Sequence, residues 1–451
     1  MIKIKAENLG DSEFRSDYGV RYSYVTGAMT HAISSPDLVC KMGEGGFLSF
    51  LGTGGINLKR LEELIQKIQS TSINKPWGVN LICDLDMPTF EESTVELFLR
   101  YGIRNLEASA FMQITKGLVI YRISSLTRNN DGSPKIHNRI MAKISRPEVA
   151  RKFLLPPPER IVNQLFEEGR ITAEEAEIAK LIPMADDVCV EADSGGHTDQ
   201  GVAYSLVPAI MKMRDDISKQ MGYSKRIRVG TAGGLGTPEA IASAFILGAD
   251  FVLTGSINQA TVEAGTSNKV KEMLQAAGPQ DTAIAPAGDM FELGAKVQVL
   301  NKGLFFPARA NKLYDLYRNY PALEDIDERT KIQIQDKFFH RSFQEVYGLV
   351  KDYYLIKDPI ELEKMEKNSK HKMAKIFRWY FAYSNRIAIK GIEEDYVNFQ
   401  ISCGPALGAF NHWVAGTNLE PWYNRHVDDI AKLLMHEAAE VLNHRLNRLL
   451  T

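Results

Sequence analysis

The chain has 451 residues and nearly balanced charge, with 54 Lys plus Arg against 56 Asp plus Glu. Its length exceeds that of one compact domain and suits a barrel of about 250 residues with an additional domain. The balanced charge argues against nucleic acid or an anionic membrane as a partner. The sequence is 44% hydrophobic, which is typical of a globular protein. No uncharged apolar run reaches the roughly 18 residues that a bilayer-spanning helix needs.

The N-terminus and the cysteines favour a cytoplasmic protein. Residues 1–7 lack the apolar core of a signal peptide. The four cysteines, Cys40, Cys83, Cys189 and Cys403, lie far apart and form no C-x-x-C motif. This spacing favours buried thiols in a reducing compartment over a disulfide framework or a metal site. We therefore expect no bound metal.

Short apolar runs alternate with helical stretches from residue 23 to residue 256, which predicts strands and helices in βα order. The predicted strands are 24–29, 47–51, 78–82, 105–108, 140–144, 188–191, 227–230 and 251–254. Such a series closes as a (β/α)8 barrel or forms a doubly wound open sheet. A Rossmann sheet places G-x-G-x-x-G after its first strand. Here the glycine clusters follow strands six, seven and eight instead, which favours a TIM barrel.

Two helices and two interruptions are predicted between these strands. Residues 203–221 carry apolar side chains every three or four positions, and 238–247 begins after an N-capping Thr237. Residues 114–138 are too long for a usual connection and predict a surface excursion. The prolines at 156–158 break what would otherwise be one long crossover helix.

The alternation stops after residue 256. Residues 259–390 are mostly helical by pattern and predict an added domain, inserted before the last barrel helix. The amphipathic stretch 427–450 suits that last helix. The predicted organisation is a barrel at 1–258, a helical domain at 259–390 that takes the substrate or its carrier, and a segment at 391–451 that returns to the barrel.

Asp193, Ser194, Gly195, Gly196 and His197 follow the sixth strand. Two consecutive glycines at the C-terminal end of a barrel strand let the backbone approach a flat or anionic ligand closely. A histidine beyond them has an unperturbed pKa of about 6.5, which suits proton transfer near neutrality. An isolated motif of this kind is more often a plain turn, but its place after a barrel strand favours a site.

Glycine-rich loops also follow the seventh and eighth strands. Backbone N–H groups at a helix N-terminus bind phosphate, and two such loops on neighbouring strands predict one shared phosphate site. The residues predicted to line it are Ala232, Gly233, Gly234, Thr254, Gly255 and Ser256.

Other small or polar residues are expected at the same end of the barrel. An amide can hydrogen-bond the edge of a heteroaromatic ring, and a lysine can stabilise negative charge on a reduced ring. Taken singly, each of these residues also suits ordinary packing or a turn. They are Gly27, Ala28, Met29 and Thr30 after the first strand, Asn80 on the third and Lys143 on the fifth.

Together these motifs resemble the nitronate monooxygenase and FMN-type enoyl reductase superfamily, and within it the PfaD-type trans-acting enoyl reductases of polyketide and polyunsaturated fatty-acid synthases. The resemblance extends over nearly the whole chain. Where the superfamily has a glutamate before the first glycine, this chain has Asp193 and Ser194. The matching segments are 27–30, 76–80, 107–109, 141–147, 193–197 and 230–234, and, outside the generic barrel motifs, 294–300, 306–314, 377–381 and 403–411.

The resemblance implies FMN as cofactor, NADPH in preference to NADH as donor, and an α,β-unsaturated thioester on an acyl carrier protein as substrate, within a polyketide or fatty-acid synthase complex. His197 is the first candidate for the proton donor, or for a hydrogen bond to the thioester carbonyl, and the resemblance alone implies Lys296 as a second acid. Whether the chain forms a homodimer is left open. Basic and aromatic residues at 364–390 could dock an acidic partner or form a solvated helix face.

Three other functions compete with this one. A nitronate oxidase would not need the long helical half. A non-catalytic scaffold for carrier proteins would not need a complete set of loops at one barrel end. A flavin-free aldolase or isomerase needs a Schiff-base lysine with a supporting carboxylate, and only Lys143 keeps that alternative open.

Overall fold

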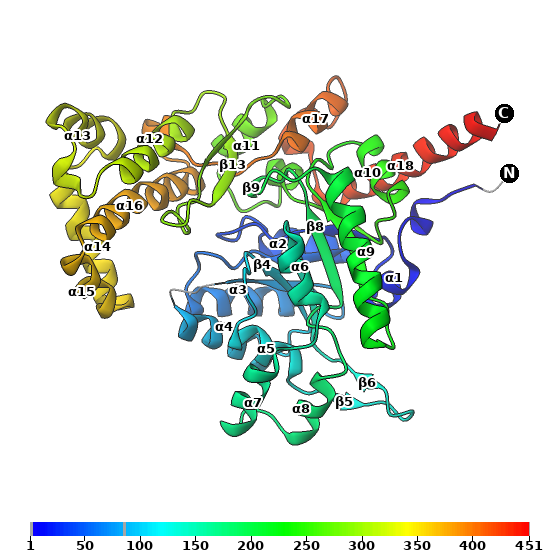
Figure 1. Ribbon diagram of the computed structural model, residues 1–451. Coiled ribbons are helices and arrows are strands. Elements are labelled where there is room, and N and C mark those ends of the chain that lie inside the picture. The colour runs from blue at the N-terminus through cyan, green and yellow to red at the C-terminus, as the bar shows by residue number, and fades with distance from the viewer. Residues whose placement is uncertain (1–2, 84–86, 451) are drawn as a thin grey trace. The chain divides into compact units, whose positions relative to one another are not determined.

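The computed structural model describes residues 3–83 and 87–450 (Figure 1). Residues 1, 2 and 451, at the ends of the predicted segments 1–258 and 391–451, lie outside the described residues. The chain divides into two compact units. The barrel unit comprises the chain up to residue 194, residues 198–265 and the chain from 409 onward, and the helical unit comprises residues 195–197 and 266–408.

Eight parallel strands close into a barrel within the described residues, so the predicted TIM barrel is confirmed. The last strand pairs with the first, with Thr26 opposite Thr254. All eight predicted strands form, and the largest difference is that the first ends at Thr26 rather than at residue 29. In barrel order they are β1 (Tyr24–Thr26), β11 (Val252–Thr254), β10 (Arg228–Ala232), β8 (Asp187–Glu191), β7 (Arg139–Ile144), β4 (Asn105–Ser109), β3 (Gly78–Ile82) and β2 (Leu48–Leu51).

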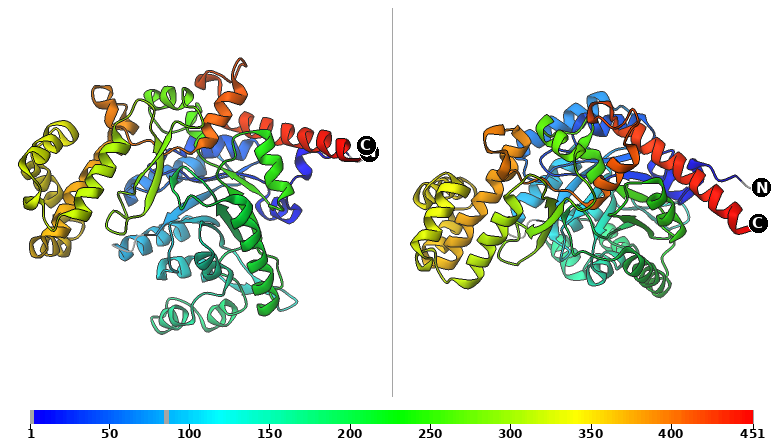
Figure 2. Two further views of the ribbon diagram at one scale, coloured as in Figure 1. Left: turned by 45° about the horizontal axis from the view of Figure 1, so that its top comes forward. Right: turned by 90° about the horizontal axis from the view of Figure 1, so that it is seen from above.

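Helices surround the barrel and bury their apolar faces against the strands (Figure 1). The last of them packs against α10 and α2. Ile4 exchanges two hydrogen bonds with Asn443 on this helix, so the N-terminal segment lies beside the C-terminal helix (Figure 2). The helices are α2 (Pro36–Glu44), α3 (Leu58–Thr71), α4 (Pro88–Arg100), α5 (Lys116–Ile123), α6 (Pro147–Leu154), α7 (Glu159–Glu167), α8 (Ala173–Ala179), α9 (Ala203–Met221), α10 (Pro238–Ile246) and α18 (Val427–Leu450).

The predicted surface excursion at 114–138 is wrong for its first part. Helix α5 occupies 116–123, and every residue from Gly117 to Ile123 is buried. A helix that is apolar all round has no amphipathic pattern, which is why the sequence did not reveal it. Only the hairpin of β5 (Thr127–Arg128) and β6 (Pro134–Lys135) extends from the surface. The prolines at 156–158 do separate α6 from α7, as expected.

The helical unit contains an antiparallel sheet that the sequence pattern did not indicate. Its strand order is β12 (Thr282–Pro286), β13 (Lys296–Leu300) and β9 (Gly196–His197). The unit spans 266–408 rather than 259–390, because residues 261–265 pack on the barrel and 401–402 pair with β13. Its helices are α11 (Asn268–Gln275), α12 (Phe306–Asn319), α13 (Glu328–Ile334), α14 (Phe343–Lys357), α15 (Pro359–Lys367) and α16 (Ser369–Lys390), and α17 (Pro405–Val414) leads back to the barrel unit.

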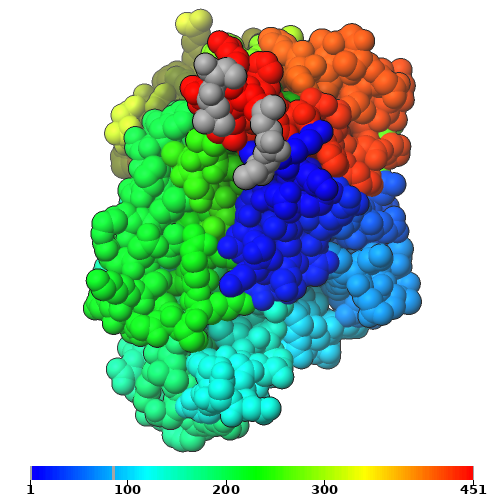
Figure 3. Space-filling model, turned by 90° about the vertical axis from the view of Figure 1, so that its right-hand side faces the viewer, coloured from blue at the N-terminus to red at the C-terminus, as the bar shows by residue number. Residues whose placement is uncertain are grey.

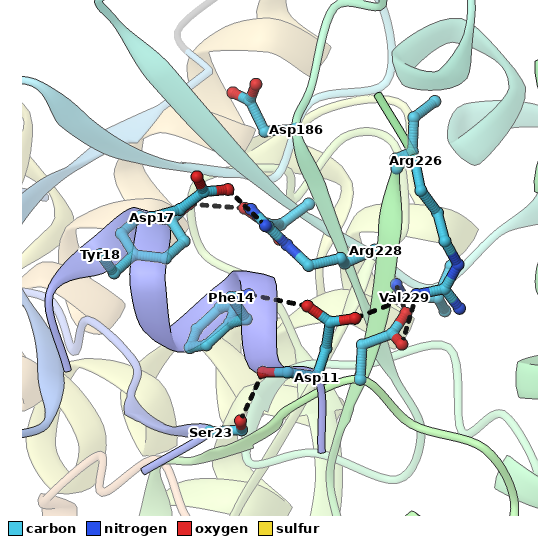
Figure 4. A network of polar contacts seen from close by, with 12 residues as sticks. Asp11, Phe14, Asp17, Tyr18, Ser23, Asp186, Arg226, Arg228 and Val229 are labelled. Atoms are coloured by element: carbon cyan, nitrogen blue, oxygen red, sulfur yellow. Dashed lines mark hydrogen bonds and ion pairs between the residues drawn. The ribbon is translucent and has the colours of Figure 1, made fainter. Parts of the chain in front are cut away.

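Helix α1 (Ser12–Tyr18) closes the N-terminal end of the barrel, where its Phe14 and Tyr18 pack against the strands. In Figure 3 this N-terminal part, in blue, lies between the green segment and the red C-terminal helix. Beneath it, buried Arg228 bonds Asp187 at 2.5 Å. It also bonds Asp17 at 2.6 Å (Figure 4). A cavity of about 220 Å³ lies beside Arg228, at the end of the barrel that serves stability rather than chemistry.

No helix in the described part of the chain is both long enough and apolar enough to cross a membrane.

Candidate active site

Three charged side chains meet inside the C-terminal end of the barrel. Lys143, on β7, places its Nζ 3.3 Å from Glu107 Oε1 on β4 and 3.2 Å from Glu191 Oε1 on β8. The two carboxylates come from the strands on either side of β7. The side chain of Glu107 is 0% exposed and that of Lys143 is 14% exposed. The sequence identified Lys143 but not its two partners.

The carboxylates fix the charge of this lysine. Burial acts against the ammonium form, but Glu191 and Glu107 outweigh burial and raise the pKa of Lys143 above its usual value. Burial raises the pKa of Glu107, and the nearby Lys143 only partly opposes that shift. A Schiff-base lysine must lose its proton to act as a nucleophile. A lysine held as an ammonium ion by two carboxylates does not suit that role, so the structure disfavours an aldolase-type barrel.

Asn80 belongs to the same polar group. Its Nδ2 donates to the carbonyl of Glu107 at 3.0 Å and to Ser109 Oγ at 2.8 Å. Ser109 Oγ in turn lies 3.3 Å from Glu107 Oε1. The amide of Asn80 is therefore used mainly to hold β4 and the carboxylate of Glu107 in place.

The loop after β1 is tied to this cluster and to its own backbone. The N–H of Ala28 donates to Glu107 Oε2 at 3.0 Å, and Gly27 N donates to the carbonyl of Thr254 at 3.0 Å. Met29 N donates to Ser34 Oγ, while Thr30 is exposed. Residues 27 and 28, predicted from the sequence, thus lie beside the ends of β4 and β11.

The loop after β10 turns through two glycines in the left-handed region. Gly233 has φ +88° and Gly234 has φ +72°. A Cβ on Gly233 would lie 1.6 Å from the carbonyl oxygen of Ala192, whereas one on Gly234 would meet nothing within 4 Å. Gly233 is therefore required for close packing against the loop after β8. Gly234 faces open space.

The neighbouring loop after β11 has the same character. A Cβ on Gly255 would also meet nothing within 4 Å. Across residues 3–83 and 87–450, no hydrogen bond is formed by the backbone N–H of Gly234 or Gly255. The hydroxyl of Thr254 is engaged, since it lies 2.6 Å from Tyr24 Oη and accepts from Asn258. Unpaired amides beside open space on two adjacent strands can hold an anion.

The motif after β8 is divided between the two units. Asp193, which has φ +52°, and Ser194 belong to the barrel unit, while Gly195 to His197 belong to the helical unit. There His197 pairs with Val297 on β13, one residue after the exposed Lys296. Both predicted acids thus lie on one small sheet.

Asp199 anchors the barrel side of this motif, which the sequence did not indicate. It accepts from Ser145 Oγ at 2.5 Å and from Arg146 Nε at 3.0 Å and Nη2 at 2.6 Å. A paired guanidinium and carboxylate of this geometry fixes orientation as well as distance. The segment that leads away from His197 is therefore held against the end of β7. No group of three or more metal-ligating side chains is found among the residues with described positions.

Two family models match the chain. Residues 16–292 match the nitronate monooxygenase family, and residues 320–399 match the inserted helical domain of [acyl-carrier-protein] S-malonyltransferase. The first match covers the barrel strands and the loops described above. The second covers most of the helices of the helical unit.

Similar proteins occur in polyketide and fatty-acid synthesis. The polyketide biosynthesis protein PksE of Bacillus subtilis is 53% identical over 98% of this chain and 58% of its own length. One of the polyunsaturated fatty acid synthase subunits of Thraustochytrium is 42% identical over 92% of this chain and 28% of its own length. The chain thus spans less than two thirds of these curated relatives.

A solved structure resembles the chain over its full length. The enoyl reductase domain of MlnA, from the macrolactin biosynthesis cluster of Bacillus amyloliquefaciens, is 45% identical with a TM-score of 0.95. The alignment covers 98% of this chain and 99% of that domain.

Proposed function

The chain belongs to the nitronate monooxygenase family and, within it, to the PfaD-type enoyl reductases; from this premise we propose that it is an FMN-dependent reductase of enoyl thioesters carried by an acyl carrier protein. NADPH would be the donor. The overall reaction adds a hydride to the β-carbon of the α,β-unsaturated thioester and a proton to the α-carbon. The likeness to an enoyl reductase domain supports the reductase over a nitronate oxidase.

The observation that carries the proposal is the combination of one buried ammonium with two open glycine loops at the same barrel end. Lys143 is held in its charged form by Glu107 and Glu191. Gly234 and Gly255 leave space in front of unpaired backbone amides. An FMN molecule has a phosphate that suits such amides and a ring whose reduced form carries negative charge. The residues present therefore fit this cofactor.

FMN, when bound, would supply the hydride acceptor and donor. The ammonium of Lys143 would favour negative charge on the ring system, because a preorganised charge in a water-poor site stabilises an anion strongly. The amides of Gly234 and Gly255 would hold the phosphate. His197 would hold the proton that the α-carbon receives, with Lys296 as the second acid.

The carrier-bound substrate is supported by the biosynthetic systems in which the relatives occur. PksE is a polyketide biosynthesis protein, and the Thraustochytrium relative belongs to a polyunsaturated fatty acid synthase. In both systems acyl chains are extended as thioesters, and a reductase that acts in trans must accept them from the synthase. We propose the helical unit as the part that meets the carrier.

The visible spectrum of the purified protein tests this function. We expect a yellow protein that NADPH bleaches without oxygen and that a crotonyl thioester then reoxidises. A nitronate should not replace the thioester. Reoxidation by the nitronate alone would establish the oxidase instead, and a colourless protein that does not take up FMN would leave a carrier-binding scaffold. A Lys143→Met variant serves as control. It should keep its fold at acid pH, and NADPH should reduce its flavin more slowly than that of the wild type.

A further inference from the structure

His197 and Asp289 form a polar pair within the helical unit. The Nε2 atom of His197 lies 2.9 Å from Oδ1 of Asp289, which is on the loop that joins β12 to β13. We infer that Asp289 is a positioning residue for His197, holding the imidazole in one orientation and favouring its protonated form. This inference rests on the proposed function, because Asp289 is the partner of the residue that is proposed there as the proton donor.

The loop that carries Asp289 is anchored on both sides. Phe291 is completely buried in an aromatic cluster, with ring centroids 5.4 Å from Tyr314 and 5.5 Å from Phe381. A Cβ on Gly288 would lie 2.6 Å from the Cβ of Phe381, so only glycine allows the chain to pass so close to α16. A loop held in this way places the Asp289 carboxylate reproducibly.

Arg378 of α16 and the loop's own backbone fix Asp289 itself. Arg378 Nη2 donates to the Asp289 carbonyl at 3.1 Å, and its Nη1 lies 3.3 Å from Glu292 on the same loop. The N–H of Met290 donates to Asp289 Oδ1 at 3.1 Å. The oxygen that meets His197 is therefore oriented by a second donor.

The pair has the arrangement expected of a histidine that transfers protons. A carboxylate bonded to one ring nitrogen selects the tautomer with its proton on that nitrogen and stabilises the imidazolium. Partial desolvation raises the pKa of Asp289, whose side chain is half-exposed, but the charge and hydrogen bond of His197 outweigh it and lower that pKa overall. The interaction is reciprocal, so the Asp289 carboxylate favours a proton on the ring by the same energy.

Other charges near the ring act in known directions. Lys296 lies next to Val297, the strand partner of His197, and its positive charge opposes protonation of the ring. Arg378, which is bonded to Asp289, also opposes protonation of the ring. Glu292, which pairs with Arg378, offsets that effect. Asp193 and Asp199, four and two residues from His197 in the chain, add negative charge. Of these charged groups, Asp289 is bonded directly to the imidazole ring.

The test is a ¹⁵N-detected titration of the histidine rings in the full chain with FMN bound, in the wild type and in Asp289→Asn. The His197 signal is assigned by its loss in His197→Gln. The variant should lower the titration midpoint of this ring by about half a pH unit or more, and the neutral wild-type ring should carry its proton on Nε2. Glu292→Gln is the matched control, because it removes a carboxylate from the same loop without touching the ring.

A titration midpoint that moves by less than about 0.2 pH units in Asp289→Asn would overturn the inference. A shift of equal size in Glu292→Gln would also overturn it. So would a neutral ring protonated on Nδ1. The titration needs no turnover, so it stands apart from the proposed activity, which fails separately if the wild type does not reduce a crotonyl thioester. In an active enzyme, Asp289→Asn should lower kcat for the thioester and move its alkaline limb to lower pH, with flavin reduction by NADPH unchanged.

Discussion

Lys143 and Glu107 form a buried ion pair across two adjacent barrel strands, with Nζ and Oε1 3.3 Å apart. Removing the cation alone leaves a carboxylate without exposure to solvent and without its counter-charge. The cost of breaking a buried pair is typically about 3–5 kcal/mol. Glu191 repels Glu107, and this repulsion is no longer offset once the lysine is gone.

Lys143→Met is therefore expected to lower the free energy of unfolding by about 3 kcal/mol at pH 8. Burial already raises the pKa of Glu107, and loss of the ammonium raises it further. A raised carboxyl pKa means that the folded state binds the proton more tightly, so the loss should shrink as pH falls through that pKa. Urea unfolding of the variant and the wild type measures the loss in free energy of unfolding at pH 8 and at pH 5.

The double variant Lys143→Met with Glu107→Gln is the control for this prediction. The glutamine can still accept from Ala28 N, but carries no charge. The double variant should recover much of the lost free energy of unfolding at pH 8, and the remaining loss should not depend on pH. Equal instability of the single and double variants at pH 8 would show that lost packing, not the unpaired carboxylate, causes the effect.

Substitutions in the glycine loops distinguish effects on FMN binding from effects on folding. Gly255→Leu should leave the barrel stable, since its Cβ enters open space, but should block the proposed phosphate position. We expect a colourless or weakly coloured protein with unchanged thermal unfolding of the apoprotein. Gly348→Leu, in helix α14, is the matched control, because its Cβ also meets nothing, and it should retain FMN.

Gly233 is a poor position for the same test. A Cβ there would collide with the Ala192 carbonyl, and its φ of +88° disfavours any other residue. Gly233→Ala should therefore reduce the stability of the apoprotein as well as flavin content. If Gly255→Leu binds FMN as tightly as the wild type, the phosphate lies elsewhere.

The barrel could be predicted from the sequence because its strands follow one another with strong apolar patterns. Lys143 and the two glycine loops could be predicted for a similar reason, since their positions at strand ends follow from the order of the strands. Glu191 also ends a strand, but nothing in a single sequence says that its carboxylate turns toward Lys143 rather than solvent.

The residues that the sequence missed depend on pairings between distant segments. Asp289 follows a strand that pattern did not reveal, and it meets His197 only because β9 pairs with β13. Helix α5 was missed because it is buried on all sides. Long-range register and complete burial leave little periodic signal in the chain.

The opposite end of the barrel should affect stability without affecting chemistry. Arg228 bonds Asp187 and Asp17 in a buried network that also includes Tyr18 Oη, 2.5 Å from Asp187. Arg228→Met leaves Asp187 without its cation and Asp17 with only one of its two cations, and should cost about 3–5 kcal/mol in urea unfolding. FMN content per folded molecule should match the wild type, and a selective loss of FMN would contradict this division.

Acid should weaken the same network in a defined direction. Burial raises the pKa of Asp17, but hydrogen bonds from Arg228 and Lys225 outweigh it and lower that pKa. A lowered folded-state pKa contributes stability above the unfolded value of about 3.8, and this is lost as pH falls below it. Asp17→Asn should therefore flatten the stability profile below about pH 4. An unchanged slope would mean that Asp17 does not carry the acid transition.

His197 remains the residue whose role decides the mechanism. His197→Gln should retain FMN and its reduction by NADPH, while kcat for a crotonyl thioester falls by about 10²–10⁴-fold, the usual contribution of a general acid. The helical unit offers a matched control in His340, which lies 3.3 Å from Asp395 in a similar pair. Because His340 has φ +51°, asparagine is the suitable replacement, and His340→Asn should leave kcat unchanged. A loss of less than about tenfold in His197→Gln would rule out the acid role and direct attention to Lys296, the other predicted acid on the same sheet.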